Sequence, residues 1–520
     1  MLWRRVVRSF LVSLAFCAPL HAAEAMLSPQ AALTRAAHFL MENLSQDGGF
    51  LWIYEVEGDR QWGELEAYPG MIWLQSPGTV DVGHLMLDLY ARYEDPYFLQ
   101  SAVQVARVLS DSQLASGGWP YFSGVSRSEG ERWVEEIGRF AWRSEEFHYP
   151  FTNGTFDDGV TIDATRFLTR LALVDDAPWI AASRDRAIQF VLVSQRADGG
   201  WPQRYPPEPD AAGPAYANAL TLNDGVMVEN IRFLYSAGRL LERPDLVAAA
   251  MRGMRRLARL PIEGEQPGWA MQYSDDYQPV AARSFEPAAL ATSTTVDNIN
   301  WLLDFYRLTG EPTLLQPIPQ ALRWLRAVVD QYADEQGVIP RHIMPATGNA
   351  VYIHRQGNNV VNGRYVITGA REGTVIHYGS FARPDLPQLE QAFESADFVP
   401  VNVDAEHWRR EFVKDAGALD HMLGWRPHTS SSDPCFRRQL EPQSVDQILA
   451  AQREDGAWIF EGGFTSNPSG LAMTPAEDTT YARTWVGDAV DTSVNCEGPR
   501  RPLYALSHFL HNMTELLRQP

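Results

Sequence analysis

The stretch SQRADGGWPQRYP, residues 194–206, closes an apolar run and opens a loop rich in proline and glycine. The preceding residues 187–193 have an apolar spacing that fits 3.6 residues per turn, which is typical of a helix. Because glycine readily adopts the left-handed conformation that ends many helices, Asp198-Gly199-Gly200 predicts a helix stop. Variants of this phrase stand at residues 46–50, 116–120 and 455–458, with a fainter copy at 335–340. The stretch therefore indicates a repeated unit.

A second repeated phrase precedes the next helix-like run each time. It begins at Thr79, Thr155, Thr221 and Thr295, and Asp or Asn follows closely. These residue types are natural N-caps, so capping alone is the simplest interpretation. The interval between successive threonines accommodates two helices with their connections. Helical hairpins repeated in this way stack as an open solenoid or close into a ring.

Long, aromatic and uneven loops favour closure of these hairpins. We therefore predict a mainly α fold, an α/α toroid of repeated helical hairpins. Residues 338–379 break the repeat, and the β-branched and aromatic residues at 351–353 and 364–368 predict a small β insertion at one rim. Residues 386–442 look irregular, and helical periodicity returns at 445–452 and 504–517. We expect a toroid over residues 26–385 and a C-terminal extension, residues 386–520, that packs on the toroid and completes it.

The first 25 residues have the features of an export signal. Arg4, Arg5 and Arg8 precede the apolar residues 10–20, and small residues at 23–25 offer a cleavage site. No later apolar run approaches the ~20 residues needed to span a bilayer. We expect a periplasmic or secreted protein with no integral membrane segment once the signal is removed. In that oxidising compartment Cys435 and Cys496 would be able to form one disulfide.

The charge balance limits the partners. The chain has 44 Lys and Arg against 65 Asp and Glu, a formal net charge of −21 at pH 7. This balance argues against nucleic acid as a partner. It also weighs against a polyanionic substrate unless basic residues gather in one cleft. The basic residues are almost all arginine, since Lys414 is the only lysine.

Two copies of the second phrase contain doubled polar residues, Asp157-Asp158 and Asn223-Asp224. Equivalent loops of a helical ring gather at the same end, so these side chains are expected to converge. Their carboxylate and amide oxygens suit a hard cation such as Ca²⁺. The alternative is that they only cap helices, and for Asp81 and Asp297 we favour capping.

Four segments carry a resemblance to a known family. They are TFDDGVTIDATRFLTRL (155–171), ADGGWPQRYP (197–206), LTLNDGVMVENIRFL (220–234) and ARSFEP (282–287). In order and approximate spacing the chain resembles the family 10 pectate lyases. The resemblance implies an α/α-toroid catalytic module that cleaves polygalacturonate by calcium-assisted β-elimination, and hence an acidic polysaccharide as substrate. We expect the enzyme to act as a monomer.

The same resemblance implies roles for individual residues. The calcium site falls on Asp157, Asp158, Asn223 and Asp224. Arg283 falls on a clamp for a substrate carboxylate, Arg341 on a second carboxylate-binding arginine, Arg355 on the proton-abstracting base and Arg371 on a further family arginine. Trp201 and Tyr205 would stack on sugar rings, although a Trp beside Gly-Gly serves equally well as a plug between helices. The chain departs from the family pattern at Asp158, where an amide is usual, at Arg204, where an aromatic is usual, and at Gln356, where an acid is usual.

These residue types suit the chemistry. Removing the proton at C5 of a uronate becomes easier when Ca²⁺ and arginine neutralise the adjacent carboxylate and stabilise the charge that develops. Arginine binds carboxylates in a bidentate manner that lysine cannot match. An arginine base must be neutral, against a usual pKa above ~12, and burial beside other cations would favour that.

Two other functions fit the sequence. One is a toroid glycoside hydrolase in which two of the acids serve as acid and base; the candidates are Asp157, Asp158, Asp224 and Glu286. The other is a carbohydrate-binding envelope protein that has kept the toroid and lost the chemistry. An unsaturated product would decide for the lyase, and new reducing ends without it would decide for hydrolysis.

Overall fold

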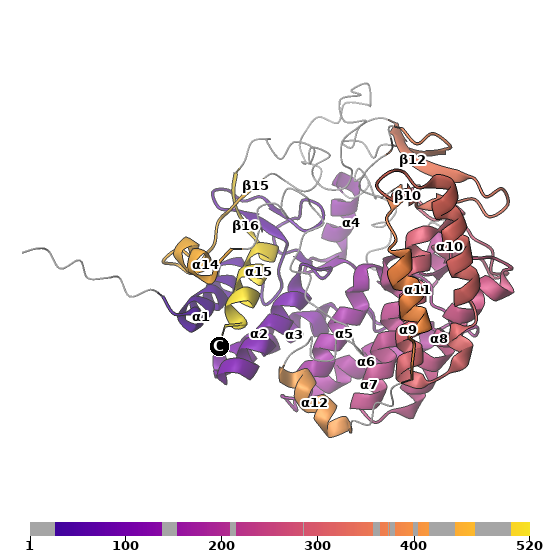
Figure 1. Cartoon of the computed structure of the whole chain (residues 1–520). Coiled ribbons are helices and arrows are strands. Elements are labelled where there is room, and N and C mark those ends of the chain that lie inside the picture. Colours follow the sequence, from indigo (N-terminus) through magenta and orange to yellow (C-terminus); the bar gives the residue numbers. More distant parts are fainter. Residues whose placement is uncertain are drawn as a thin grey trace, which may run out of the picture.

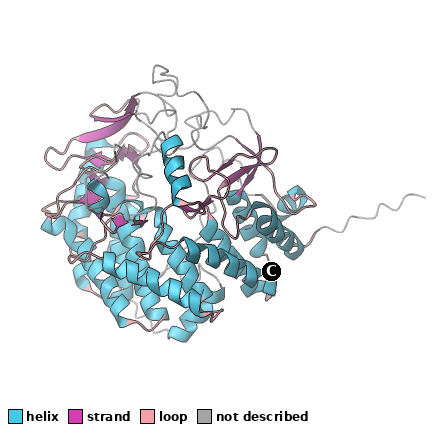
Figure 2. Ribbon diagram, turned by 180° about the vertical axis from the view of Figure 1, so that it is seen from behind, coloured by secondary structure: helices cyan, strands magenta, loops and turns pink. Residues whose placement is uncertain are grey.

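The computed structural model describes residues 27–137, 153–207, 215–283, 285–356, 364–372, 374, 380–398, 404–414, 443–462 and 501–519. The predicted export segment, together with Cys435 and Cys496, lies outside these residues. The fold is the predicted α/α toroid: helices make up one side of the molecule, and the strands gather at the other (Figures 1 and 2).

The helices come in consecutive pairs that pack together. The pairs are α2 (Thr79–Tyr93) with α3 (Pro96–Ser112), α5 (Val160–Leu171) with α6 (Pro178–Ser194), α7 (Val226–Leu240) with α8 (Pro244–Glu263), and α9 (Thr292–Thr309) with α10 (Ile318–Tyr332). The first helix of a pair also contacts its counterpart in the next pair, as α2 does with α5 and α5 with α7. Helix α5 is buried over its whole length, whereas α6 exposes one side. The first helices thus form the inner layer.

The glycine phrase ends helices, as predicted, and its tryptophan closes the seam behind them. The indole of Trp201 donates to the carbonyl of Val191 on α6 at 2.9 Å. The same bond joins Trp119 to Leu109 and Trp458 to Ile448. Trp201 has no exposed surface, so its predicted role in stacking on sugars is wrong. A tryptophan that fills the seam between helices cannot also present a face to substrate.

A threonine in the first turn of three inner helices ties the helix to the preceding loop. The hydroxyls of Thr79, Thr161 and Thr295 accept hydrogen bonds from the backbone N–H groups of Phe50, Trp119 and Trp269 respectively. Helix α1 (Pro29–Phe39) and a short π-helix (Leu40–Leu44) precede the first of these loops.

Asp81 and Asp297, the single acids of the second repeated phrase, differ in role. Asp81 accepts a hydrogen bond from the Gly78 N–H at 2.8 Å, which confirms the predicted cap. Asp297 lies inside α9, so capping is wrong for it. Helix α9 begins directly after a strand, and its first residues leave Asp297 in the second turn.

The predicted β insertion is present at the rim. Strands β13 (Arg364–Thr368), β12 (Ala350–Gln356), β11 (His342–Ile343) and β9 (Leu290–Ala291) form an antiparallel sheet in that order. A second sheet was not expected: β15 (Phe460–Gly462), β16 (Arg501–Ala505), β1 (Ile53–Glu55) and β2 (Gln61–Trp62) pair in that order. It joins the C-terminal segment to the N-terminal one.

The remaining strands are two-stranded pairs in the loops. They are β3 (Ile72–Trp73) with β4 (Phe122–Ser123), β5 (Gly154–Thr155) with β6 (Arg204–Tyr205), β7 (Leu220–Thr221) with β8 (Gln272–Tyr273), and β10 (Ile339–Pro340) with β14 (Phe381–Ala382). In the first three pairs, a strand before an inner helix pairs with a strand that follows the outer helix of the same repeat, whereas β10 follows α10 and pairs with the strand before α11. Helix α4 (Arg127–Glu136) stands beside these loops (Figure 1).

The C-terminal part contains more helix than its sequence suggested. The expected helices at 445–452 and 504–517 are observed as α14 (Val445–Ala451) and α15 (Leu506–Leu517), and α15 packs on α1 and α2. Residues 386–442 were expected to be irregular, but they include α11 (Leu386–Glu394) and α12 (Ala405–Lys414). Helix α12 packs at the end of the toroid away from the strands, where Arg170 donates to the carbonyls of Phe412 and Val413 at 2.9 Å each. Among the described residues, no helix is long and apolar enough to cross a membrane.

The glycine turn gives a direct test of the repeat. Gly199 has φ +101°, and a Cβ at this position would lie 2.6 Å from the carbonyl oxygen of Arg252. We expect Gly199→Ala to lower the free energy of unfolding by about 2–4 kcal/mol, because both strain and overlap oppose it. Gly337 is the matched control: its φ is +75° and a Cβ would meet nothing within 4 Å. Chemical denaturation of both variants would contradict this account if Gly337→Ala were as destabilising as Gly199→Ala.

Candidate active site

Two identical turns carry the paired polar residues. Short 3₁₀ turns at Asp157–Gly159 and Asn223–Gly225 immediately precede α5 and α7. Their central residues Asp158 and Asp224 have positive φ angles of 48° and 50°, and a left-handed glycine follows each. A left-handed conformation costs a residue with a side chain about 1–2 kcal/mol, although aspartate tolerates it better than most. Strain of this kind is often found at functional sites, and here it occurs at both copies.

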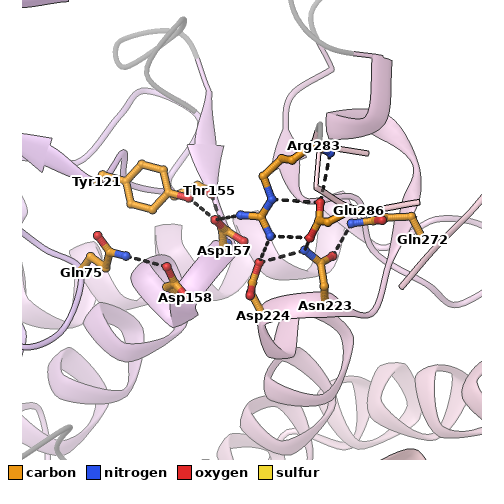
Figure 3. A network of polar contacts seen from close by, with 10 residues as sticks. All are labelled: Gln75, Tyr121, Thr155, Asp157, Asp158, Asn223, Asp224, Gln272, Arg283 and Glu286. Atoms are coloured by element: carbon orange, nitrogen blue, oxygen red, sulfur yellow. Dashed lines mark hydrogen bonds and ion pairs between the residues drawn. The ribbon is translucent and has the colours of Figure 1, made fainter. Parts of the chain in front are cut away.

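Arg283 joins the two turns. Its guanidinium binds both carboxylate oxygens of Glu286, with Nε 2.9 Å from Oε2 and Nη2 2.7 Å from Oε1. The same group donates to Asp224, and its Nη1 lies 3.5 Å from Oδ2 of Asp157 (Figure 3). Arg283, Glu286 and Asp157 are buried. One arginine thus neutralises acids from both turns and from its own loop.

The asparagine of the second turn is oriented by its neighbours. Its Nδ2 donates to Oε1 of Glu286 at 2.9 Å and to Oδ2 of Asp224 at 2.8 Å. Its Oδ1 accepts from Gln272 on β8 at 2.5 Å. Because every atom of the amide is engaged, the orientation of Asn223 follows from the network.

The first turn is built differently. The carboxylate of Asp157 accepts a hydrogen bond from the Tyr121 hydroxyl. The backbone N–H of Asp157 donates to the Thr155 hydroxyl at 3.1 Å. Arg204, the residue that departs from the family pattern, is buried with its guanidinium 5.3 Å from the centre of the Tyr121 ring. It therefore lies behind the residue that contacts Asp157. Asp158 accepts from Gln75 at 2.5 Å.

The predicted arginines occupy three different environments. Arg341 directly precedes β11, and burial lowers its pKa despite the opposing fields of Asp224, Glu286 and Asp297; Arg283 lowers it further. Arg355 lies on β12 opposite Tyr365, and its side chain is outside the described residues. Arg371 is partly exposed and pairs with Asp334 at 2.6 Å, so its described contacts do not bring it to the cluster. Tyr205 is half-buried with its ring edge on Phe190, and its role in sugar stacking stays a prediction.

The cluster has the oxygen chemistry of a calcium site, but its described geometry is that of an arginine site. Within the described residues, no three or more His, Cys, Asp or Glu side chains are grouped so as to hold a metal ion. The positive charge between Asp157 and Asp224 belongs to Arg283. Carboxylate and amide oxygens nevertheless are the donors that Ca²⁺ prefers.

A buried ion network supports the two turns from below. Arg166 on α5 binds Asp163 at 2.8 Å and Glu229 on α7 at 2.5 Å, and Glu229 also binds Arg232 at 2.6 Å. The guanidinium of Arg232 lies 4.4 Å from the ring of Trp301 on α9. Burial alone would raise the pKa of Glu229, but Arg166 and Arg232 together lower it. The network ties the helices that begin at the two turns.

Sequence reasoning did not single out several residues of this site. It named Glu286 only for a hydrolase, and it gave no role to Gln75, Tyr121, Gln272 or Arg166. The signal for Arg166 was available, because DDGVTIDATRFL and NDGVMVENIRFL repeat the same acid and arginine positions. Gln75, Tyr121 and Gln272 also had a signal, because each follows a tryptophan by two or three residues: Trp73, Trp119 and Trp269 respectively.

The segment that contains the candidate site is similar to the polysaccharide lyases. Residues 113–343 match the family model described as pectic acid lyase, which confirms the resemblance found in the sequence. No curated protein matches the chain.

Solved structures add only weak similarities. The family 10 polysaccharide lyase from Cellvibrio cellulosa is 18% identical, over 65% of this chain and 98% of that one, with a TM-score of 0.35. A mutant from the same organism, in complex with trigalaturonic acid, is 17% identical over 64% and 98%, with a TM-score of 0.35. Unsaturated glucuronyl hydrolase from Bacillus sp. GL1 is 12% identical over 94% of each chain, with a TM-score of 0.34. At such scores these similarities carry no argument about function.

The ion network predicts an acid-sensitive contribution to stability. Because the pKa of Glu229 is lower in the folded protein, its stabilisation is complete above the unfolded pKa near ~4.3 and is lost as pH falls through the folded value. We expect Glu229→Gln to cost about 1–3 kcal/mol at pH 7, since each arginine keeps another contact. The difference in the free energy of unfolding between Glu229→Gln and wild type should narrow below about pH 4.

Denaturant titrations at pH 7 and at pH 3.5 would measure this gap. Glu242→Gln is the matched control, because Glu242 forms an exposed pair with Arg409 and should change stability by about 1 kcal/mol or less. A Glu229→Gln penalty that is equally large at both pH values would contradict the assignment.

Proposed function

We propose that this polysaccharide lyase is exported and cleaves pectate, or a related polyuronate, by calcium-assisted β-elimination. The observation that carries the proposal is the buried Arg283–Glu286 pair, whose guanidinium reaches the acids of both turns. It lies within the segment that matches pectic acid lyase. A preorganised guanidinium suits the planar carboxylate of a uronate.

The reaction needs charge stabilisation more than it needs a nucleophile. A base removes the proton at C5, the C4–O bond breaks, a C4–C5 double bond forms, and the leaving oxygen takes up a proton. Negative charge develops on the carboxylate next to C5 before the C4–O bond breaks. Fixed positive groups beside that carboxylate lower the barrier, because they need no reorganisation when the charge appears.

The residues have separate tasks in this proposal. Arg283 and Arg341 bind substrate carboxylates, and Arg371 extends the basic lining at the rim. Asp157, Asp158, Asn223 and Asp224 would hold Ca²⁺, which when bound neutralises a uronate carboxylate. With Ca²⁺ held by these residues, its charge would offset the negative charge that an acidic chain presents to an acidic polymer.

Arg355, on β12, is the proposed base. The strand that bears it pairs with β11, which begins one residue after Arg341. Burial lowers the pKa of Arg341, so this rim already provides an environment that disfavours a charged guanidinium. A guanidinium loses its proton more readily where it is buried or close to other cations, because both disfavour the charged form.

A glycoside hydrolase is a weaker proposal for this site. It needs two carboxyl groups that face the sugar, one of them able to donate a proton. Both oxygens of Glu286 accept from Arg283, and Asp224 and Asp157 also contact that arginine. These acids therefore serve the arginine in the described structure, which favours elimination.

The central test is the ultraviolet absorbance of the unsaturated product formed from polygalacturonate. We expect turnover that depends on added Ca²⁺ and falls when a chelator removes it. Arg355→Ala should lower kcat by about 10²–10⁴-fold, which is the usual effect of losing a general base. Arg243→Ala, at an exposed surface pair with Asp245, is the control and should keep wild-type activity.

Three outcomes separate the functions. New reducing ends without ultraviolet absorbance would point to hydrolysis. Binding of polygalacturonate without any product would point to a carbohydrate-binding protein. Full activity of Arg355→Ala would remove Arg355 from the mechanism but leave the lyase assignment in place.

A further inference from the structure

Gln75 comes from a part of the chain that the family match does not cover, yet it contacts the site. The match begins at residue 113, whereas Gln75 follows β3 in the first repeat. Its side-chain nitrogen lies 2.5 Å from Oδ2 of Asp158, across the site from Arg283 (Figure 3). The first repeat therefore contributes a side chain to the wall of the site.

The orientation of the Gln75 amide is determined by a donor that cannot act as an acceptor. The indole nitrogen of Trp73 donates to Oε1 of Gln75 at 3.0 Å. An indole N–H can only donate, so the amide oxygen must face Trp73 and the amide nitrogen must face Asp158. A second indole, that of Trp52, donates to the backbone carbonyl of Gln75 at 2.9 Å. Both the backbone and the side chain of Gln75 are thus held.

The support beneath Gln75 is rigid. Trp73 is fully buried, stacks on Phe122 with ring centres 5.6 Å apart, and meets Trp133 edge-on at 6.2 Å. A Cβ at Gly63 would lie 2.1 Å from the Trp73 ring, so the backbone packs directly against it. Gln75 itself is only 5% exposed. Moving its amide would disturb a closely packed aromatic cluster.

The two equivalent aspartates are consequently held by different chemistry. Asp224 receives a guanidinium from Arg283, whereas Asp158 receives the neutral amide of Gln75. An amide donor orients a carboxylate and favours its ionised form without cancelling its charge. Asp158 is also the position where the chain has an acid in place of the amide typical of its relatives.

We propose that Gln75 is a positioning residue: it orients the Asp158 carboxylate toward the site, so that the first repeat contributes to a site whose central cluster of acids and Arg283 lies in residues 113–343. The inference rests on the proposed function for its kinetic readout only. The Gln75–Asp158 contact has a separate readout in stability.

Gln75→Glu is the informative variant. It preserves the size of the side chain and the acceptor for Trp73, but it places a second carboxylate against Asp158. We expect kcat/KM on polygalacturonate to fall about 10–100-fold, the usual effect of losing a partner that orients a ligand side chain. Two facing carboxylates repel when both are ionised, so the loss of activity should be present at pH 7 to 8.

The stability readout does not depend on activity. The melting temperature of Gln75→Glu should fall well below that of wild type at pH 7 and approach it near pH 4, where the pair is protonated. The double variant Gln75→Glu with Asp158→Asn again pairs one amide donor with one carboxylate acceptor, but the donor now stands at position 158. It should recover the melting temperature at pH 7 and remove its pH dependence.

Gln195→Glu is the matched control for a merely structural role. Gln195 donates to the backbone carbonyls of Gly199 and Ala249, away from the cluster. It should lower the melting temperature but leave kcat/KM and the pH profile of the folded enzyme unchanged. The inference is overturned if Gln75→Glu keeps wild-type kinetics, if it behaves as this control does, or if the double variant fails to restore stability. A wild type that forms no unsaturated product, together with the expected stability pattern, would refute the proposed function and leave the contact itself established.

Discussion

The bond between Arg283 and Glu286 is the interaction on which the site depends. Burying either charge alone would cost several kcal/mol, so each requires the other. The bidentate geometry orients the guanidinium, and its remaining donors then reach Asp224 and Asp157 on two different helix starts. Without this pair the two acidic turns would face each other with uncompensated negative charge. The arginine is therefore both the structural link between the repeats and the group best suited to meet a carboxylate.

The toroid supplies what this interaction needs, namely two equivalent turns at a constant separation. In three repeats a threonine hydroxyl holds the loop to the inner helix, and tryptophan indoles close the seams behind the glycine stops. Below the turns, Arg166 bridges Asp163 on α5 and Glu229 on α7. The repeat thus places a layer of structural ion pairs directly beneath the ion pairs of the candidate site. In both repeats the acid of the lower layer, Asp163 or Glu229, follows the first residue of the turn, Asp157 or Asn223, by six positions.

The sequence predicted those features that arise from local chemistry. Glycine phrases identified the helix ends because a left-handed turn is a property of a few consecutive residues, and the β-branched residues at 351–353 identified a rim strand. The paired acids were recognised because they occur twice. Trp201 was ambiguous, since an exposed and a buried tryptophan look alike in a sequence, and only its packing against α6 shows that it is a plug. The helices α11 and α12 were missed, and the packing of Trp408 and Phe412 against Leu240 stabilises α12.

By itself, then, the sequence determined the class of fold, the repeated turns and the resemblance to pectic acid lyase, because each of these is written in contiguous residues. Only the tertiary structure decided which side chains meet. Gln75 reaches Asp158 across 83 positions of sequence, and Arg283 reaches Asp157 across 126. Such contacts depend on how the ring closes, and no local pattern encodes closure. Charge compensation at the site is a property of that closed ring. Distant segments bring Arg283, Gln75 and Tyr121 to the acids of two motifs that the sequence could identify only as repeats.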